Sequence, residues 1–180
     1  NWVTAPWRVD YDVIDDNGDK KVLHNGANHH ALLAVNPDVF TLQSGQDLAM
    51  TNTFSTTGGW LRGVFLNYTK NSSTSYDFYT VYITQDGGQA APKVDKWENS
   101  THLGSDITTI LSVTGLGASS LLSGEGQMIV TYDAEAQDIG IDVQIDSDFS
   151  ISTNVVDASF SSGMAGLYAK APGGYTISET

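Results

Sequence analysis

The sequence has no cysteine, and only 8 of its 180 residues are lysine or arginine. Without cysteine there is neither a disulfide framework nor thiol chemistry, so stability has to come from the core. The 8 basic residues stand against 21 acidic ones, which gives a formal net charge of −13. Because nucleic acids and anionic membrane surfaces require a basic footprint, we expect neither as a partner. The charge favours a neutral or cation-bearing ligand.

Long hydrophobic runs and helical patterns are also scarce. No apolar run approaches the roughly 18–20 residues that a helix needs to span a bilayer, and Asn1–Asp10 does not resemble a signal peptide. The chain instead has 18 glycines, abundant Thr, Ser, Val and Tyr, and turn signals at a spacing typical of sandwiches and barrels. We therefore predict a single all-β domain over residues 1–180, built as an antiparallel β-sandwich of about eleven to twelve strands.

Two segments show strand periodicity clearly. Trp7–Asp16 alternates apolar and polar residues, and Asn17 and Gly18 follow it as a two-residue hairpin turn. Lys20–His24 is then the returning strand. Ile139–Ile145 alternates more strictly, with its isoleucines and valine on one side and Gly, Asp and Gln on the other. This segment predicts a half-buried strand with its apolar side facing the core.

The stretch Gly58–Ile83 concentrates the aromatic residues of the chain. Two aromatic and β-branched runs flank the polar segment Thr69–Ser75, which predicts a hairpin with an exposed tip. The aromatic residues are more numerous than a two-sided core needs, so we expect one face to meet a ligand. They are Trp60, Phe65, Tyr68, Tyr76, Phe78, Tyr79 and Tyr82.

Strand parity divides this hairpin into two sets. With one choice of which alternate residues point inward, an apolar set faces the core. Its members are Leu61, Phe65, Tyr79, Val81 and Ile83. The same choice exposes a candidate binding set: Trp60, Arg62, Tyr68 and Tyr82, with Asn67 beside it. The opposite choice fits the sequence nearly as well, because both faces of the hairpin carry apolar residues, as they do in a sheet buried on both sides. If the binding set is buried, the candidate site lies instead in the loops around Trp97 or at the N-terminal tryptophans, Trp2 and Trp7.

An exposed set of this composition fits a sugar. The apolar C–H faces of a sugar ring stack on flat aromatic rings, while Arg and Asn side chains bond the hydroxyls around the rim. Arg62 would also suit the carboxylate or sulfate of an anionic sugar.

The first predicted turn also offers oxygen ligands for calcium. Asp15, Asn17 and Asp19 occupy the one, three and five positions of a calcium loop. The pattern then fails, because Lys20 stands where the loop needs Gly and Gly26 where it needs a bidentate Glu. A hairpin turn without an ion explains every residue of this segment, and a bound structural Ca²⁺ is the alternative.

The order of motifs from Gly59 onward resembles a known fold family. A Gly-aromatic strand is followed by a hairpin, an aromatic strand, a strand ending in a short acidic turn, and SGMAGLYA at Ser162–Ala169. This succession resembles the concanavalin A-like jelly roll of laminin-G-like domains and bacterial carbohydrate-binding modules. The last strand departs from many relatives, which carry Phe-Asp-Asn where this chain has Gly174, Tyr175 and Thr176. Any calcium held by such an Asp is therefore in doubt.

Enzymes with this fold include glycoside hydrolases and polysaccharide lyases. A glycosidase needs two carboxyl groups about 5–10 Å apart, and the chain lacks the Glu-x-Asp-x-x-Glu pattern of the concanavalin A-like glucanases. Tyr168 and Lys170 resemble the Tyr-x-Lys strand of alginate lyases, but the companion strands are missing. Asp142, Asp146 and Asp148 could form a catalytic cluster, although alternating outward Asp residues are more typical of a solvated face.

We therefore predict a noncatalytic carbohydrate-binding module, monomeric and extracellular or at the cell surface of a bacterium. It would recognise a plant or algal polysaccharide through Trp60, Arg62, Tyr68, Tyr82, Asn67 and Trp97. One alternative is a hydrolase or lyase of the same fold. Another is an adhesive domain that depends on calcium at Asp15, Asn17 and Asp19.

Overall fold

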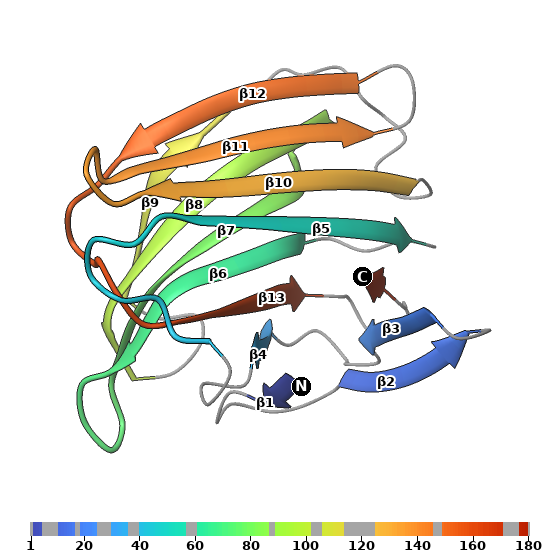
Figure 1. Cartoon of the computed structure of the whole chain (residues 1–180). Coiled ribbons are helices and arrows are strands. Elements are labelled where there is room, and N and C mark those ends of the chain that lie inside the picture. The colour runs from blue at the N-terminus through green and yellow to red at the C-terminus, as the bar shows by residue number, and fades with distance from the viewer. Residues whose placement is uncertain are drawn as a thin grey trace.

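The computed structural model consists of two β-sheets that face each other (Figure 1). It describes the ranges 2–4, 11–16, 19–24, 30–35, 40–56, 61–86, 89–101, 106–113, 125–145, 149–170 and 177–179. Every regular element within these ranges is a strand, and all pairings are antiparallel, as the sequence predicts. No helical segment of bilayer-spanning length and hydropathy occurs in them.

Sheet A has seven strands among the described residues. Their order is β1 (Trp2–Thr4), β4 (His30–Val35), β13 (Met164–Lys170), β6 (Leu61–Lys70), β7 (Tyr76–Asp86), β8 (Gln89–Ser100) and β9 (Ile107–Ser112). Sheet B also has seven in the described part. Their order is β12 (Phe149–Val156), β11 (Asp138–Ile145), β10 (Glu125–Asp133), β5 (Leu48–Thr56), β14 (Ile177–Glu179), β3 (Asp19–His24) and β2 (Tyr11–Asp16).

The main core lies between the two sheets, where their inward-facing side chains meet. The predicted alternation of Ile139–Ile145 is confirmed, because its isoleucines and valine are buried while Asp142 and Gln144 are exposed. From sheet A, this core receives Val64 and Leu66. Each fully buried aliphatic side chain contributes about 1.5–3 kcal/mol of transfer free energy, so this layer is the main stabilising term.

A bulge in β6 changes which side chains face the core. The pairing of β6 with β7 shifts register between Leu66 and Thr69, and Asn67 has a left-handed backbone conformation with φ of 57°. Because of this extra residue, side chains after the bulge point to the opposite side of the sheet from the one that strict alternation would give. As a result Phe65 and Tyr68 lie on the same side of sheet A although their numbers differ in parity.

The predicted division of the hairpin is therefore half right. Tyr79, Val81 and Ile83 of β7 face the core between the sheets, as predicted. The inward assignment of Leu61 and Phe65 in β6 is wrong, because both pack on the opposite side of sheet A. Both faces of β6 are apolar, so the alternation alone does not decide which one faces sheet B.

The side of sheet A away from sheet B carries a second buried layer, the outer aromatic cluster. Its members are Phe65, Tyr68, Tyr76, Phe78, Tyr82, Trp97 and Tyr168. Phe78 and Trp97 stack with ring centroids 5.0 Å apart and planes 12° from parallel. Sheet A is thus buried on both sides, which explains why its sequence contains more aromatics than one core requires.

The first predicted hairpin is confirmed in the backbone. Asp16 pairs with Asp19 and Asp15 with Lys20 across β2 and β3, which leaves a two-residue connection between the strands. That register is the one expected of a tight hairpin turn at Asn17 and Gly18.

Candidate functional site

The predicted binding residues do not form an exposed surface. Among the described members, the exposed fractions are 3% for Arg62, 0% for Asn67, 2% for Tyr68, 7% for Tyr82 and 0% for Trp97. The exposure predicted for Arg62, Tyr68 and Tyr82 is therefore wrong. Trp60 lies outside the described residues. A sugar-contacting role for this set stays a prediction.

The buried members are divided between the two faces of sheet A. Arg62 stands directly opposite Ile83, which belongs to the core between the sheets, so Arg62 also lies on that side. The predicted outward direction of Arg62 is wrong for this reason. Tyr68, Tyr82 and Trp97 belong instead to the outer aromatic cluster.

Two polar side-chain groups of the outer aromatic cluster are hydrogen-bonded to side chains on the same side of sheet A. The Tyr82 hydroxyl donates to Asp95 Oδ2 over 2.6 Å, and Trp97 Nε1 donates to the Thr80 hydroxyl over 2.9 Å. Burial, together with the hydrogen bond to Asp95, holds the pKa of Tyr82 well above its usual range. These contacts are those of an interior layer.

Of the three carboxylates considered for catalysis, only Asp142 lies within the described residues. Asp142 is exposed on β11, where its cross-strand neighbours are Ile129 and Ser152. Asp146 and Asp148 lie outside the described residues.

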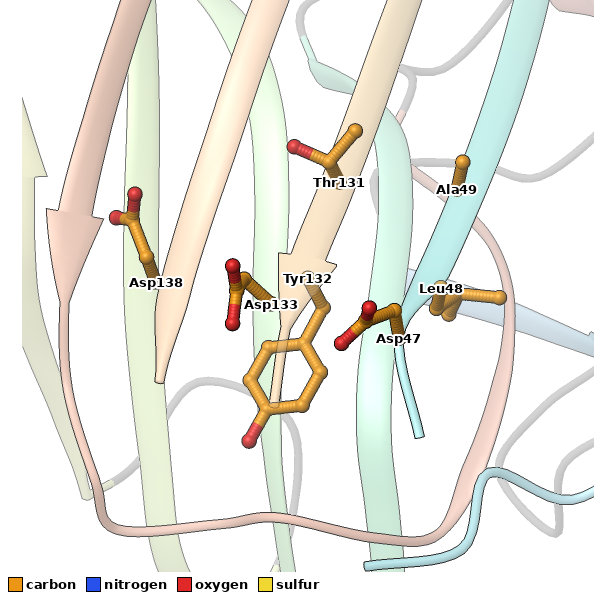
Figure 2. Close-up of a pocket in the computed structure, with 7 residues that line it drawn as sticks. All are labelled: Asp47, Leu48, Ala49, Thr131, Tyr132, Asp133 and Asp138. Carbon is orange, nitrogen blue, oxygen red and sulfur yellow. The ribbon is translucent and has the colours of Figure 1, made fainter. Parts of the chain in front are cut away.

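An open hollow lies at one end of sheet B, where β5 begins, β10 ends and β11 begins (Figure 2). It has a volume of about 450 Å³. It is lined by Asp47, Leu48, Ala49, Thr131, Tyr132, Asp133 and Asp138. Three carboxylates from three strand ends thus share one open space with two hydroxyl-bearing side chains.

The carboxylates of the hollow are oriented by nearby N–H groups. Asp47 Oδ1 accepts from the backbone N–H of Ala134 over 2.9 Å, and Asp133 Oδ1 accepts from that of Ala136 over 2.8 Å. Asp138 accepts from the Asn154 side-chain amide at 2.9 and 3.0 Å. The turn at residues 134–137 is therefore held by the same carboxylates that line the hollow.

Cross-strand pairing brings two of these carboxylates together. Asp133 and Asp138 stand directly opposite each other in the β10–β11 ladder. Such pairs have Cβ atoms about 4.5–5.5 Å apart. Two carboxylates at this spacing can accept hydroxyl or ammonium donors from one small ligand.

The connection at residues 157–163, which we call the connector, runs from β12 of sheet B to β13 of sheet A beneath the hollow (Figures 1 and 2). Tyr132 points from the hollow toward it, and its hydroxyl donates to the Phe160 carbonyl over 3.4 Å. From sheet A, Asn67 Nδ2 donates to the same carbonyl over 2.8 Å. Gly163 exchanges two backbone hydrogen bonds of 2.9 Å with Leu42.

The glycine at the end of the connector is required by both conformation and space. Gly163 has φ of 134°, which side chains rarely adopt, and an added Cβ would lie 2.7 Å from the carbonyl carbon of Asn67. Gly163, the first Gly of the SGMAGLYA motif, thus allows the connector to pass close to the β6 bulge.

Tyr79 and Asp157 form the strongest polar contact of the connector. The Tyr79 hydroxyl donates to Asp157 Oδ1 over 2.6 Å and accepts from the Phe160 N–H over 3.1 Å. Burial of the hydroxyl, with the Asp157 bond, raises the pKa of Tyr79 well above its usual range. Burial alone would raise the pKa of Asp157, but hydrogen bonds from Tyr79 and Ser159, aided by Lys96, hold that pKa below its ordinary value.

No group of three or more His, Asp or Glu side chains that could hold a metal ion occurs in the described part of the chain. For the predicted calcium ligands, the structure gives only the backbone of Asp15 and Asp19, and Asn17 lies outside the described residues. Calcium binding there stays a prediction.

Sequence reasoning did not find the hollow, although a signal for it exists. Asp133 ends β10, and Asp47 precedes β5 by one residue. Carboxylates at the ends of strands that neighbour each other in a sheet lie close together, but the strand order that makes them neighbours comes from the structure.

Comparisons with known proteins agree on the fold. A legume lectin-like domain from Entamoeba histolytica matches with a TM-score of 0.61 at 12% identity, over 99% of this chain and 86% of that one. Lectin I-B4 from Griffonia simplicifolia, in a metal-free form, gives 0.64 at 8% identity, over 99% and 89%. The exoplasmic/lumenal domain of VIP36, in a Ca²⁺/Man-bound form, gives 0.59 at 7% identity, over 99% and 82%.

No protein-family model matches the sequence, and no curated protein matches it either. The structural matches cover nearly the whole chain, so the chain has the concanavalin A-like jelly-roll fold of legume lectins. The fold that the sequence resemblance implied is confirmed.

Proposed function

We propose that the protein binds a carbohydrate without cleaving it, and that the hollow at Asp47, Asp133 and Asp138 is its binding site. The observation that carries this proposal is an open, hydroxyl-accepting hollow on a lectin-like sandwich. Structural neighbours are lectins, and VIP36 was solved in a Ca²⁺/Man-bound form. Fold alone does not assign function, so the chemistry of the hollow has to support the assignment.

The hollow has the chemistry of a sugar site. Ionised carboxylates accept two or more hydrogen bonds each, and vicinal sugar hydroxyls are matched donors. Thr131 adds a hydroxyl, while Leu48 and Ala49 offer apolar surface to the C–H face of a ring. Its lining contains no Lys or Arg, so neutral or amine-bearing sugars fit better than acidic ones.

The finer parts of the proposal concern source and location. A plant or algal polysaccharide remains the ligand class that we propose, with an extracellular or cell-surface location. Neighbours such as VIP36 are exoplasmic/lumenal domains, which supports a location outside the cytosol. Contact through surface aromatics and Arg62 receives no support from the described residues, because these side chains are buried.

A hydrolase using Asp133 and Asp138 is the second candidate. Retaining glycosidases use two carboxyl groups about 5–5.5 Å apart, and Asp133 and Asp138 are the one pair of lining carboxylates that stand opposite each other in a ladder of described strands. Release of reducing ends from a bound polysaccharide would establish this candidate over simple binding.

Calorimetry against neutral, amine-bearing and acidic oligosaccharides tests the proposal. Asp47→Asn and Asp133→Asn should each weaken binding of neutral and amine-bearing oligosaccharides about tenfold, since each replaces a charged acceptor. Asp142→Asn is the matched control, because Asp142 is an exposed Asp of the same sheet outside the hollow. Absence of binding to the whole panel, or equal binding by all variants, would overturn the proposal.

A further inference from the structure

We infer that Tyr79, a core residue of sheet A, is a positioning residue for the hollow on sheet B. This inference rests on the proposed function of the hollow. The hairpin that the sequence singles out would then act on the site from the interior, through the connector, without touching the ligand.

The first step is the contact between Tyr79 and the connector. The Tyr79 hydroxyl donates a 2.6 Å hydrogen bond to the Asp157 carboxylate and accepts a 3.1 Å hydrogen bond from the Phe160 N–H. The Tyr79 and Phe160 rings pack with centroids 4.9 Å apart. Ser159 N–H also donates to Asp157 Oδ1 at 2.9 Å, and Lys96 Nζ lies 3.9 Å from Asp157 Oδ2. One hydroxyl thus fixes two points of the connector.

The second step joins the connector to the wall of the hollow. The Asp157 N–H donates to the carbonyl of Gln137 over 3.0 Å. Gln137 ends the turn at residues 134–137 and has a left-handed φ of 53°, a conformation that costs free energy in a residue other than Gly. Asp138, which lines the hollow, follows it directly. The hydrogen bond from Asp157 therefore helps to hold the conformation that places Asp138.

The third step comes from the hollow itself. The same turn is held at its other end by Asp47 and Asp133, which accept from Ala134 and Ala136. Tyr132, another lining residue, also reaches the connector through Phe160. A looser connector would free the turn and, with it, the carboxylates that bind the ligand.

The test compares two buried Tyr–Asp hydrogen bonds of equal length on the same strand. Tyr79→Phe removes the 2.6 Å bond to Asp157, while Tyr82→Phe removes the 2.6 Å bond to Asp95 on the opposite face of sheet A. A purely structural role predicts similar effects of both changes. A positioning role predicts an effect on the hollow from Tyr79→Phe alone.

Amide hydrogen exchange of Ala134, Ala136 and Asp157 gives a readout that needs no ligand, because their N–H groups hold the turn. We expect Tyr79→Phe to speed their exchange about tenfold and to weaken oligosaccharide binding about threefold to tenfold. Tyr82→Phe should leave the three exchange rates within about twofold of the wild type. Asp157→Ala, which loses the carboxylate and keeps Tyr79, should repeat the effect of Tyr79→Phe.

Wild-type exchange rates in Tyr79→Phe, or equal acceleration in Tyr82→Phe, would overturn the inference whether or not a glycan binds. Failure of the wild type to bind any oligosaccharide, with the exchange pattern as expected, would overturn only the function of the hollow.

Discussion

Tyr82 and Asp95 are joined by a 2.6 Å hydrogen bond inside the outer aromatic cluster, where the exposed fraction of Asp95 is 6%. Thr109 donates a second bond of 2.6 Å to the same carboxylate. The carboxylate is thereby bonded to two neutral donors that tie β7, β8 and β9 together. The bonding explains how an acidic group is accommodated among aromatic rings.

Replacement of Asp95 by Ala should therefore destabilise the protein strongly. The change leaves the buried Tyr82 hydroxyl without its acceptor, and an unsatisfied buried donor costs about 1–3 kcal/mol beyond the lost contacts. We expect a lower melting temperature by circular dichroism. Asp142→Ala, at an exposed position, is the control and should change the free energy of unfolding by less than about 0.5 kcal/mol. Equal melting temperatures for the two variants would contradict the prediction.

Stability should fall in acid partly through Asp157. Its pKa is lowered in the folded protein, so the carboxylate stabilises the fold above its unfolded-state pKa, near about 4. That contribution is lost as the pH falls through the lower folded-state pKa. Urea unfolding of the wild type and Asp157→Asn between pH 6 and pH 2 measures it. The gap in unfolding free energy should shrink toward low pH, and a gap that widens would show that the sign is wrong.

The charge of the hollow should select among sugars. Three carboxylates without a lining cation should repel uronic or sulfated oligosaccharides, and should favour neutral or amine-bearing ones of the same length. Binding of an acidic oligosaccharide should improve in Asp47→Asn, since one negative charge is removed. Calorimetry at low and moderate salt measures both effects, because salt screens the repulsion. Stronger binding of acidic than of neutral sugars by the wild type would place the ligand elsewhere.

Calcium removal tests the first hairpin. The ladder between β2 and β3 is that of a tight turn, so we expect the melting temperature to be unchanged by a chelator. A fall of several degrees that added Ca²⁺ reverses would instead establish an ion. Asp15→Asn then tells the two cases apart, because only an ion at Asp15, Asn17 and Asp19 would be lost with that change.

The sequence predicted the fold class well because strand periodicity and turn residues are local signals. Ile139–Ile145 and the turn after Asp16 follow from spacing alone. Which side of β6 faces the core between the sheets could not be predicted, since both of its sides are apolar and the bulge at Asn67 depends on pairing with β7. The large aromatics of Gly58–Ile83 indicated an exposed surface only because the second buried layer is not visible in a sequence.

The hollow was missed for a related physical reason. Asp47 and Asp133 are far apart in the chain, and they meet because β5 and β10 are neighbours in sheet B. Strand order is a non-local property, fixed by how the whole sandwich packs. Sites made of strand ends therefore depend on topology more than on motifs.

Because sheet A is buried on both sides, it should tolerate fewer substitutions than sheet B. Most positions of β6 and β7 have neighbours above and below, so few substitutions there would be neutral. The outer face of β10, β11 and β12 is exposed to solvent at positions outside the hollow such as Gln127, Gln144 and Ser152, where substitutions should be tolerated. New recognition surfaces would arise more readily on sheet B, while sheet A preserves the architecture.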